Sequence, residues 1–153
     1  MNIRLSIPDD IQACVVVRGQ TRENMVSAGQ LAALGITVES WANDVRSGSL
    51  TGYVCTDHES IVGYCFGDNA SGEVVVLALL PDYERRGVGQ RLLTLVIKHL
   101  SDAGHKRLFL SCAADPATRS HGFYRHLGWA STEIFDPAGD EILELFPSPN
   151  SEA

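Results

Sequence analysis

The sequence predicts a single α/β domain with a central mixed, mostly antiparallel sheet of about six to seven strands and about four flanking helices. Three observations predict this fold. The chain has 153 residues, which is the length of one domain with one core. Its middle alternates between polar and apolar residues with the period of strands. Before and after that stretch, apolar residues recur every three or four positions, as in helices that pack one face on a sheet.

The N-terminal third is predicted to hold one short strand at 2–7 and then helices. The first helix covers 11–18, because a Pro-Asp-Asp start directly precedes it. Serine and threonine favour helix N-caps, and glycine favours helix ends. The expected caps and ends of the next helical segments are Ser27, Gly35, Thr37 and Gly48.

Three extended runs follow, at 50–57, 61–67 and 73–80, joined by turn-like segments, which predicts an antiparallel meander. An amphipathic helix begins after Gly89 and ends at Gly104. The last predicted elements are a strand at 107–113, a helix at 118–126 and strands at 129–135 and 141–146. We expect the domain to cover 2–148 and a polar tail to cover 149–153.

Composition excludes several functional classes. Nineteen acidic against twelve basic residues give a net charge of −7, which disfavours nucleic acid and anionic lipid as partners and suits an amine substrate. No apolar run approaches the ~18 residues of a membrane span, and the N-terminus does not read as a signal segment, so we expect a cytoplasmic protein. The four cysteines have no C-x-x-C spacing and no histidine pair has ligand spacing, so we expect neither a disulfide nor a metal.

A basic loop with two glycines follows the third extended run and leads into the amphipathic helix. Successive N–H groups at a helix N-terminus form an anion site, and Gly87 and Gly89 allow a ligand to approach the backbone. Arg85, Arg86 and Arg91 add positive charge, which points to a diphosphate. The ATP-binding P-loop pattern and the third glycine of the dinucleotide fingerprint are both missing. The alternative is a solvated basic turn that caps a helix.

Two motifs together carry a family resemblance. The loop reads Pro-x-Tyr-x-Arg-Arg-Gly-Val-Gly at 81–89, and His-Gly-Phe-Tyr-Arg-His-Leu-Gly-Trp follows at 121–129. In this order, with a helix and a strand between them, they resemble the GNAT superfamily of acyl-CoA-dependent N-acetyltransferases. The resemblance spans 3–146 and implies a single GNAT-like domain. The sequence departs from the family pattern at Glu84, where glutamine or arginine is usual, and at Ala117, where asparagine is usual.

The resemblance implies that acetyl-CoA is the co-substrate. Loop N–H groups from Arg85 to Gln90 would hold its diphosphate, and the strand edge at 77–79 would pair with its pantetheine amides. An N–H near Leu79 would polarise the thioester carbonyl. Thr118 and Arg119 would replace the missing asparagine contact. The cofactor-binding residues implied are Leu77, Ala78, Leu79, Arg85, Arg86, Gly87, Val88, Gly89, Gln90, Thr118 and Arg119.

Two residues are the catalytic candidates. Glu73 matches the family's position for a general base, and period-two alternation places it on one face with Val75, Leu77 and Leu79. The alternatives are an ordinary exposed carboxylate with a water relay, or His121 or Glu23 as lesser candidates. Tyr124 matches the tyrosine that, in similar enzymes, hydrogen-bonds the CoA sulfur and protonates it as it leaves; the alternative is a tyrosine packed under the sheet.

We expect the acceptor to bind beside the N-terminal helices, at the polar residues Arg22, Glu23 and Asn24. The alternative is that these residues only cap helices and form surface ion pairs, which contribute little to stability. The first hypothesis is direct transfer of an acetyl group to a primary amine of a small molecule or peptide. The alternatives are a non-catalytic acyl-CoA-binding regulatory module, or an acyltransferase with a longer acyl donor or an oxygen acceptor. Free edges of the final strands suit a homodimer.

Overall fold

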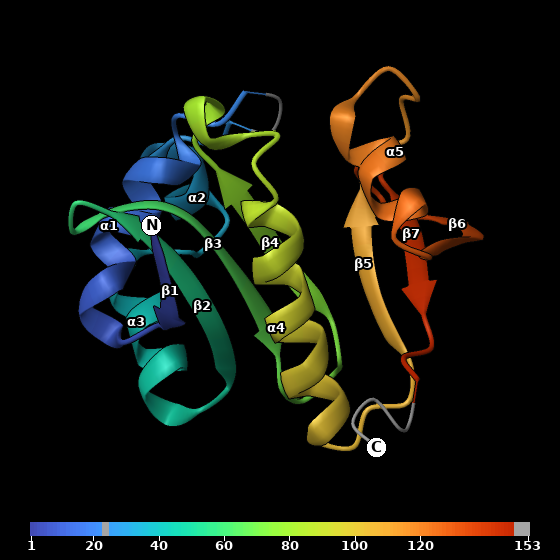
Figure 1. Ribbon diagram of the computed structural model, residues 1–153, viewed down its shortest axis with the longest axis horizontal. Coiled ribbons are helices and arrows are strands. Elements are labelled where there is room, and N and C mark those ends of the chain that lie inside the picture. The colour runs from blue at the N-terminus through green and yellow to red at the C-terminus, as the bar shows by residue number, and fades with distance from the viewer. Residues whose placement is uncertain (23–24, 149–153) are drawn as a thin grey trace.

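The computed structural model describes residues 1–22 and 25–148, which form two sheets and their flanking helices (Figure 1). The first sheet has the strand order β1-β2-β3-β4 and the second β5-β7-β6. The strands are β1 (Asn2–Leu5), β2 (Leu50–Asp57), β3 (Ser60–Asp68), β4 (Val74–Leu79), β5 (Leu108–Cys112), β6 (Ala130–Phe135) and β7 (Glu141–Leu145). The α-helices are α1 (Ile11–Arg18), α2 (Ala28–Ala33), α3 (Val38–Ser47), α4 (Val88–Asp102) and α5 (Arg119–His126), and short 3-10 turns cover Pro8–Asp10 and Pro81–Tyr83.

The predicted α/β fold class is confirmed, with seven strands and five α-helices in the part of the chain that the structure describes. The predicted N-caps are confirmed too, because Gln30 N–H donates to Ser27 Oγ at 3.1 Å and Ser40 N–H donates to Thr37 Oγ1 at 3.0 Å. Gly48 ends α3 in the left-handed conformation, with a φ of 85°. These local signals placed the helices correctly.

The predicted single sheet is divided into two parts. Every strand pair inside each sheet is antiparallel. β4 and β5 run in the same direction (Figure 1), and an isolated parallel bridge between Glu73 and Phe109 joins them. There Phe109 N–H donates to Gly72 O at 3.3 Å. Past this bridge the two strands have no further pairing among the described residues, so their facing edges diverge. β6, one of the final strands, forms an outer edge of the second sheet, where the expected homodimer would pair; that expectation stays a prediction.

Two apolar cores cover the two faces of the first sheet. One core lies under α4 and continues to β5, β7 and Tyr124. The other lies under α1 to α3 and contains Trp41, Tyr64 and Phe66, whose rings meet edge to face at 5.3–5.8 Å between centroids. β4 contributes side chains to both cores, so it is the strand around which the domain is built.

A bulge in β4 changes which residues share a face. Val74 pairs with Gly67 and Val76 pairs with Phe66, so Val75 has no opposite residue on β3. Val74 therefore packs in the α4 core together with Leu77, although the two are three positions apart.

The bulge corrects one sequence-based argument. Strict alternation placed Glu73 on one face with Val75, Leu77 and Leu79, but Val74 packs in the α4 core with Leu77 and Leu79. Glu73 directly precedes Val74, so it belongs to the opposite face, which α1 to α3 cover. The prediction of the face was wrong because a bulge inserts one residue into the period of two.

None of the helices in the described ranges is long and apolar enough to cross a membrane. All four cysteines are buried and free. Within residues 1–22 and 25–148, no three His, Cys, Asp or Glu side chains gather as metal ligands would.

Candidate active site

A cavity of about 460 Å³ opens where β4 and β5 diverge. Its walls are β4, the end of β5, the loop after β4 and the N-terminal half of α5. This volume is typical of small-molecule sites, whose cavities measure roughly 300–1,000 Å³. The divergence of β4 and β5 therefore produces a cavity large enough to bind a small molecule.

The facing strand edges present backbone groups to this cavity. Leu80 N–H donates to Val62 O at 2.9 Å, which places the peptide groups of Leu80 on the β3 side. In an antiparallel ladder these directions alternate, so N–H and C=O of Leu79 and Leu77 point away from β3, toward β5. On β5, Phe109 N–H donates to Gly72 O, so the peptide groups of Phe109 point toward β4. Because these directions alternate along a strand, the peptide groups of Ser111, two residues later, also point toward β4. An extended ligand with amides can pair with both edges.

The N-terminus of α4 forms the end wall of the cavity. Arg91 N–H donates to Gly87 O at 3.1 Å, which is the first bond of the helix, so the N–H groups of Val88, Gly89 and Gln90 have no acceptor within it. Gly87 is the N-cap, has a φ of 79° and supplies no side-chain cap. Arg85 also has a positive φ, of 65°. Such a turn gathers N–H groups into a site for an anion, reinforced by the helix dipole.

Gly89 faces into the cavity. A Cβ at Gly89 would lie 3.7 Å from the Phe123 ring and 4.0 Å from Leu77, both of which line the cavity. The missing side chain therefore keeps open the space between α4 and α5. Phe123 was quoted in the sequence motif, but its contribution to this wall could not be read from its position in the chain.

A contact distant in sequence anchors the loop. Tyr83 O–H donates to Asp57 Oδ2 at the end of β2, at 2.6 Å, which lowers the pKa of Asp57 and raises the pKa of Tyr83. The Arg86 guanidinium lies 5.0 Å from the centre of the Tyr83 ring. Arg86 is thus part of the anchor, and it does not line the cavity. No local signal in the sequence connects Tyr83 to Asp57.

Glu84 joins three segments at the cavity wall. Its carboxylate Oε1 accepts Nε–H of Arg22 at 3.1 Å and lies 3.4 Å from Arg119 Nη1. The Glu84 side chain is only 10% exposed, and all three residues line the cavity. Glutamate at this family-variant position thus links the loop after β4 to α5 and to the segment after α1. The other two predicted acceptor residues, Glu23 and Asn24, lie outside the described residues.

Tyr124 is buried and forms part of the cavity wall. Its ring lies edge to face against Phe123 at 5.1 Å and Trp129 at 6.1 Å. Burial raises the pKa of the Tyr124 phenol above its usual value of 10, so the hydroxyl stays protonated at neutral pH. It can therefore donate a hydrogen bond into the cavity, as the sequence-based role requires; that role stays a prediction.

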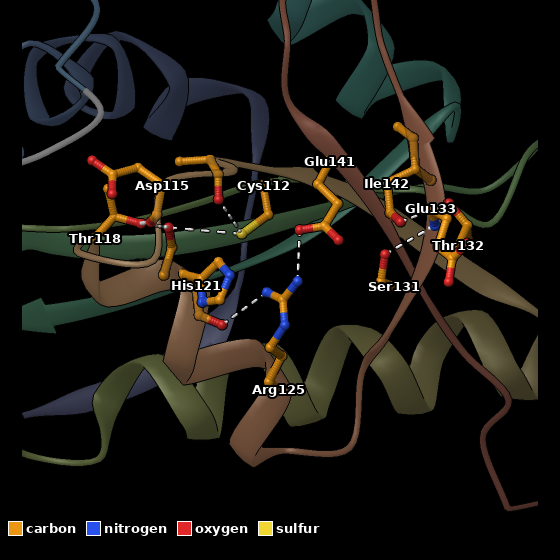
Figure 2. A network of polar contacts seen from close by, with 12 residues as sticks. Cys112, Asp115, Thr118, His121, Arg125, Ser131, Thr132, Glu133, Glu141 and Ile142 are labelled. Atoms are coloured by element: carbon orange, nitrogen blue, oxygen red, sulfur yellow. Dashed lines mark hydrogen bonds and ion pairs between the residues drawn. The ribbon is translucent and has the colours of Figure 1, made fainter.

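A partly buried ion pair positions α5 and with it Tyr124. Arg125 Nη2 lies 2.6 Å from Glu141 Oε1 on β7, and Arg125 Nη1 donates to His121 O at 3.1 Å (Figure 2). Glu141 is 7% exposed. A hydrogen bond from the Ser131 hydroxyl and then the pairing with Arg125 lower the pKa of Glu141, which keeps this carboxylate charged. The network fixes α5 on the second sheet.

Glu73 lies at the closed end of the opening, beside Phe109. The carboxyl is half-buried; burial first, and the nearby Asp68 second, raise its pKa. Glu73 does not line the cavity. At ~3.3 Å per residue, its Cα lies at most roughly 13 Å along the strand from that of Leu77, so the two residues do not share one position along the cavity. A role as base would therefore act through water.

The remaining sequence-predicted residues divide into two groups. Those that line the cavity are Leu77, Ala78, Leu79, Arg85, Gly87, Gly89, Gln90 and Arg119. Those that do not are Arg86, Val88 and Thr118. The Val88 side chain is buried in the core, and Thr118 Oγ1 donates to Asp115 O at 2.8 Å. Two further residues line the cavity, Thr21 and Ser111. Thr21 directly precedes the predicted acceptor residue Arg22, whereas the exposure of Ser111 along a strand edge depends on the fold.

Solved structures of acetyltransferases share this fold. The PaiA N-acetyltransferase of Thermoplasma acidophilum, solved with coenzyme A, aligns with a TM-score of 0.72 at 18% identity over 96% of this chain and 100% of its own. A putative acetyltransferase of Salmonella typhimurium, solved with acetyl-CoA, aligns with a TM-score of 0.75 at 14% identity over 95% and 93%.

The ribosomal-protein-S18-alanine N-acetyltransferase of Escherichia coli aligns with a TM-score of 0.69 at 19% identity over 96% of this chain and 95% of its own. No curated protein sequence gives a significant match. The sequence profile of the acetyltransferase (GNAT) family matches residues 24–129, which is more than half of the chain. The match includes β4, the glycine loop, α4 and α5, which are the elements that build the cavity. The chain therefore belongs to the GNAT family of acetyltransferases.

Proposed function

We propose that this protein is an acetyl-CoA-dependent N-acetyltransferase that moves the acetyl group directly to a primary amine of a small molecule or peptide. One observation carries the proposal. The outward peptide groups of Leu77 and Leu79 lead along one cavity to the open N-terminus of α4. That is the order of partners that the pantetheine arm of acetyl-CoA, with its two amides, and the diphosphate that follows it require.

The residues present fit acetyl-CoA as a substrate. The N–H groups of Val88, Gly89 and Gln90 lack helical acceptors, and Gly89 leaves room for an anion beside them. Arg85 and Arg119 add positive charge to the same cavity. The structures of relatives with coenzyme A and acetyl-CoA support this choice of donor. Four free cysteines support a cytoplasmic location, where thiols stay reduced.

The chemistry divides between two residues. The neutral amine attacks the thioester carbon, the C–S bond breaks, and the amine loses a proton. Glu73 accepts that proton through water, since it lies outside the cavity wall, and Tyr124 donates a hydrogen bond to the departing thiolate. An N–H near Leu79 stabilises the oxyanion. The relative named for an N-terminal alanine of a ribosomal protein supports a peptide as one acceptor class.

Thiol release tests the proposal directly. With acetyl-CoA and a panel of primary amines, we expect amine-dependent release of free CoA thiol and an acetylated product of matching mass. Acetyl-CoA at a hundredfold excess over its Kd should stabilise the protein by ~2.7 kcal/mol, which is several degrees in Tm. A thermal shift without any thiol release would support the binding module instead, and the absence of a thermal shift would exclude both.

Glu73→Gln is expected to lower kcat by about a hundredfold with amines of high pKa. Deprotonating a lysine-like amine of pKa ~10.4 at neutral pH costs roughly 4–5 kcal/mol, against about 1 for an α-amine of pKa ~7.8, so the loss should be smaller with α-amines. Burial raises the pKa of Glu73, and a base acts only when ionised. Activity of the wild type should therefore rise with pH through a midpoint above 4.5, and the pH profile of the variant should lack that limb. An equal loss with both amine classes would contradict the assignment.

Glu84→Gln is expected to tighten acetyl-CoA about fivefold at low salt. The carboxylate sets a negative charge against Arg22 and Arg119 in the cavity that must receive a diphosphate, and glutamine removes that charge while it keeps the shape. Screening shortens the reach of such charges to ~8–10 Å at physiological salt, so the gain should shrink as salt rises. Calorimetric titration at two ionic strengths measures this. Weaker binding of the variant would show instead that Glu84 mainly positions Arg119.

A further inference from the structure

We propose that the acceptor amine carries an apolar group of aromatic or branched-aliphatic size, which binds in a second cavity between β4 and the helices α1 to α3. This inference rests on the proposed function, because it names the class of amine for the same transfer.

The second cavity has a volume of about 440 Å³. Its walls are mostly apolar and include Leu31, Leu34, Ile36 and Trp41. A phenyl or branched aliphatic group needs a site of this kind, since its affinity comes from removing apolar surface from water. Trp41 packs in the core under α1 to α3 and also forms one wall of this cavity.

The second cavity adjoins the first along β4. Arg18, Val75 and Val76 line both cavities. Val75 is the bulged residue of β4, and it is 39% exposed although it lies within a strand. A molecule seated against the helices therefore has its other end at the same strand whose outer edge faces the first cavity. An amine on a short linker from the apolar group would meet a thioester there.

The exposure and charge of the residues that line the second cavity favour a neutral apolar group as its ligand. Leu34 is 74% exposed and Ile36 is 38% exposed, so the cavity presents apolar surface to water that a ligand would cover. Its charged wall residues in the described ranges are one cation, Arg18, and one anion, Asp44. A polyamine or an aminoglycoside needs several carboxylates, so this balance disfavours both. A neutral apolar group satisfies the walls without them.

A matched pair of amines tests the inference. The kcat/KM for 2-phenylethylamine should exceed that for ethylamine at least tenfold, because the two share the aminoethyl group and differ in the ring. Leu34→Glu should reduce this ratio to near one, since it places a charge at the cavity without disturbing the core. Val16→Glu is the control, because Val16 is 56% exposed on α1 and lines neither cavity; it should keep the ratio.

A second readout does not depend on turnover. Titration with 2-phenylethylamine should change the fluorescence of Trp41 in the wild type and in Val16→Glu but not in Leu34→Glu. If acetyl-CoA binds and no thiol is released, this titration still supports the cavity while the transfer fails. Equal kcat/KM for both amines, or a preference for spermidine, would overturn the inference and leave the acetyltransferase intact. A dimer that Leu34→Glu dissociates without altering selectivity would assign the apolar walls to a second copy of the chain and overturn it too.

Discussion

Gly89→Glu is expected to abolish measurable binding of acetyl-CoA while the protein becomes no less stable. Gly89 is the second residue of α4, and a side chain there would project between Phe123 and Leu77 into the cavity. A carboxylate about 5 Å from a diphosphate costs about 3 kcal/mol per unit charge at an effective dielectric constant of 20, which is more than a hundredfold in Kd. Calorimetric titration and the thermal shift with acetyl-CoA measure the loss.

The same substitution should favour the helix. An acidic residue in the first turn interacts favourably with the helix dipole by about 0.3–1 kcal/mol, and replacing glycine inside a helix reduces the entropy lost on folding. Gly29→Glu is the matched control, because Gly29 is the second residue of α2 and is exposed away from both cavities. It should raise Tm to a similar extent and leave the Kd for acetyl-CoA unchanged. A Gly89→Glu variant that is stable and still binds acetyl-CoA would exclude the α4 N-terminus as the diphosphate site.

The elements and their ends could be predicted because their causes are local. Ser27, Thr37 and Gly48 cap or end helices through bonds to residues at most four positions away. The glycine loop could be predicted for the same reason, because the strand, the turn and the start of the helix follow one another in the chain. The two motifs at 81–89 and 121–129 together indicated the GNAT family, and the family-profile match over residues 24–129 confirms it.

The features that could not be predicted from the sequence depend on contacts between residues far apart in the chain. The bulge at Val75 arises from the register of β4 on β3, and it reversed the predicted face of Glu73. The links from Glu84 to Arg22 and Arg119 span separate elements, and Glu84 appeared in the sequence only as a departure from the family pattern. The division of the sheet at Phe109 likewise appears only once both strands are placed. The cavity between them is a product of that division.

Tyr124→Phe is expected to lower kcat about a hundredfold and to leave the Kd of acetyl-CoA within twofold of the wild type. The departing CoA thiol has a pKa near ~8.5 and a phenol one near ~10, so complete proton transfer from tyrosine is already uphill by about 2 kcal/mol. Burial raises the pKa of Tyr124 further, which increases that difference. The hydroxyl therefore acts mainly by donating a hydrogen bond to the thiolate as the C–S bond breaks, a contact that exists only on the way to products. Single-turnover thiol release, with binding measured separately, distinguishes this loss from weaker binding.

Tyr64→Phe is the control that separates catalysis from packing. Tyr64 is also buried, burial also raises its pKa, and its hydroxyl has no hydrogen-bond partner among the described residues. It lines neither cavity, so its loss should leave kcat unchanged, and removing an unsatisfied buried hydroxyl should be neutral or stabilising. If Tyr124→Phe keeps the wild-type kcat while thiol release still requires an amine, the phenol serves only to pack against Phe123 and Trp129. The proton would then reach the thiolate from solvent, and α5 would contribute to the cavity by shape alone.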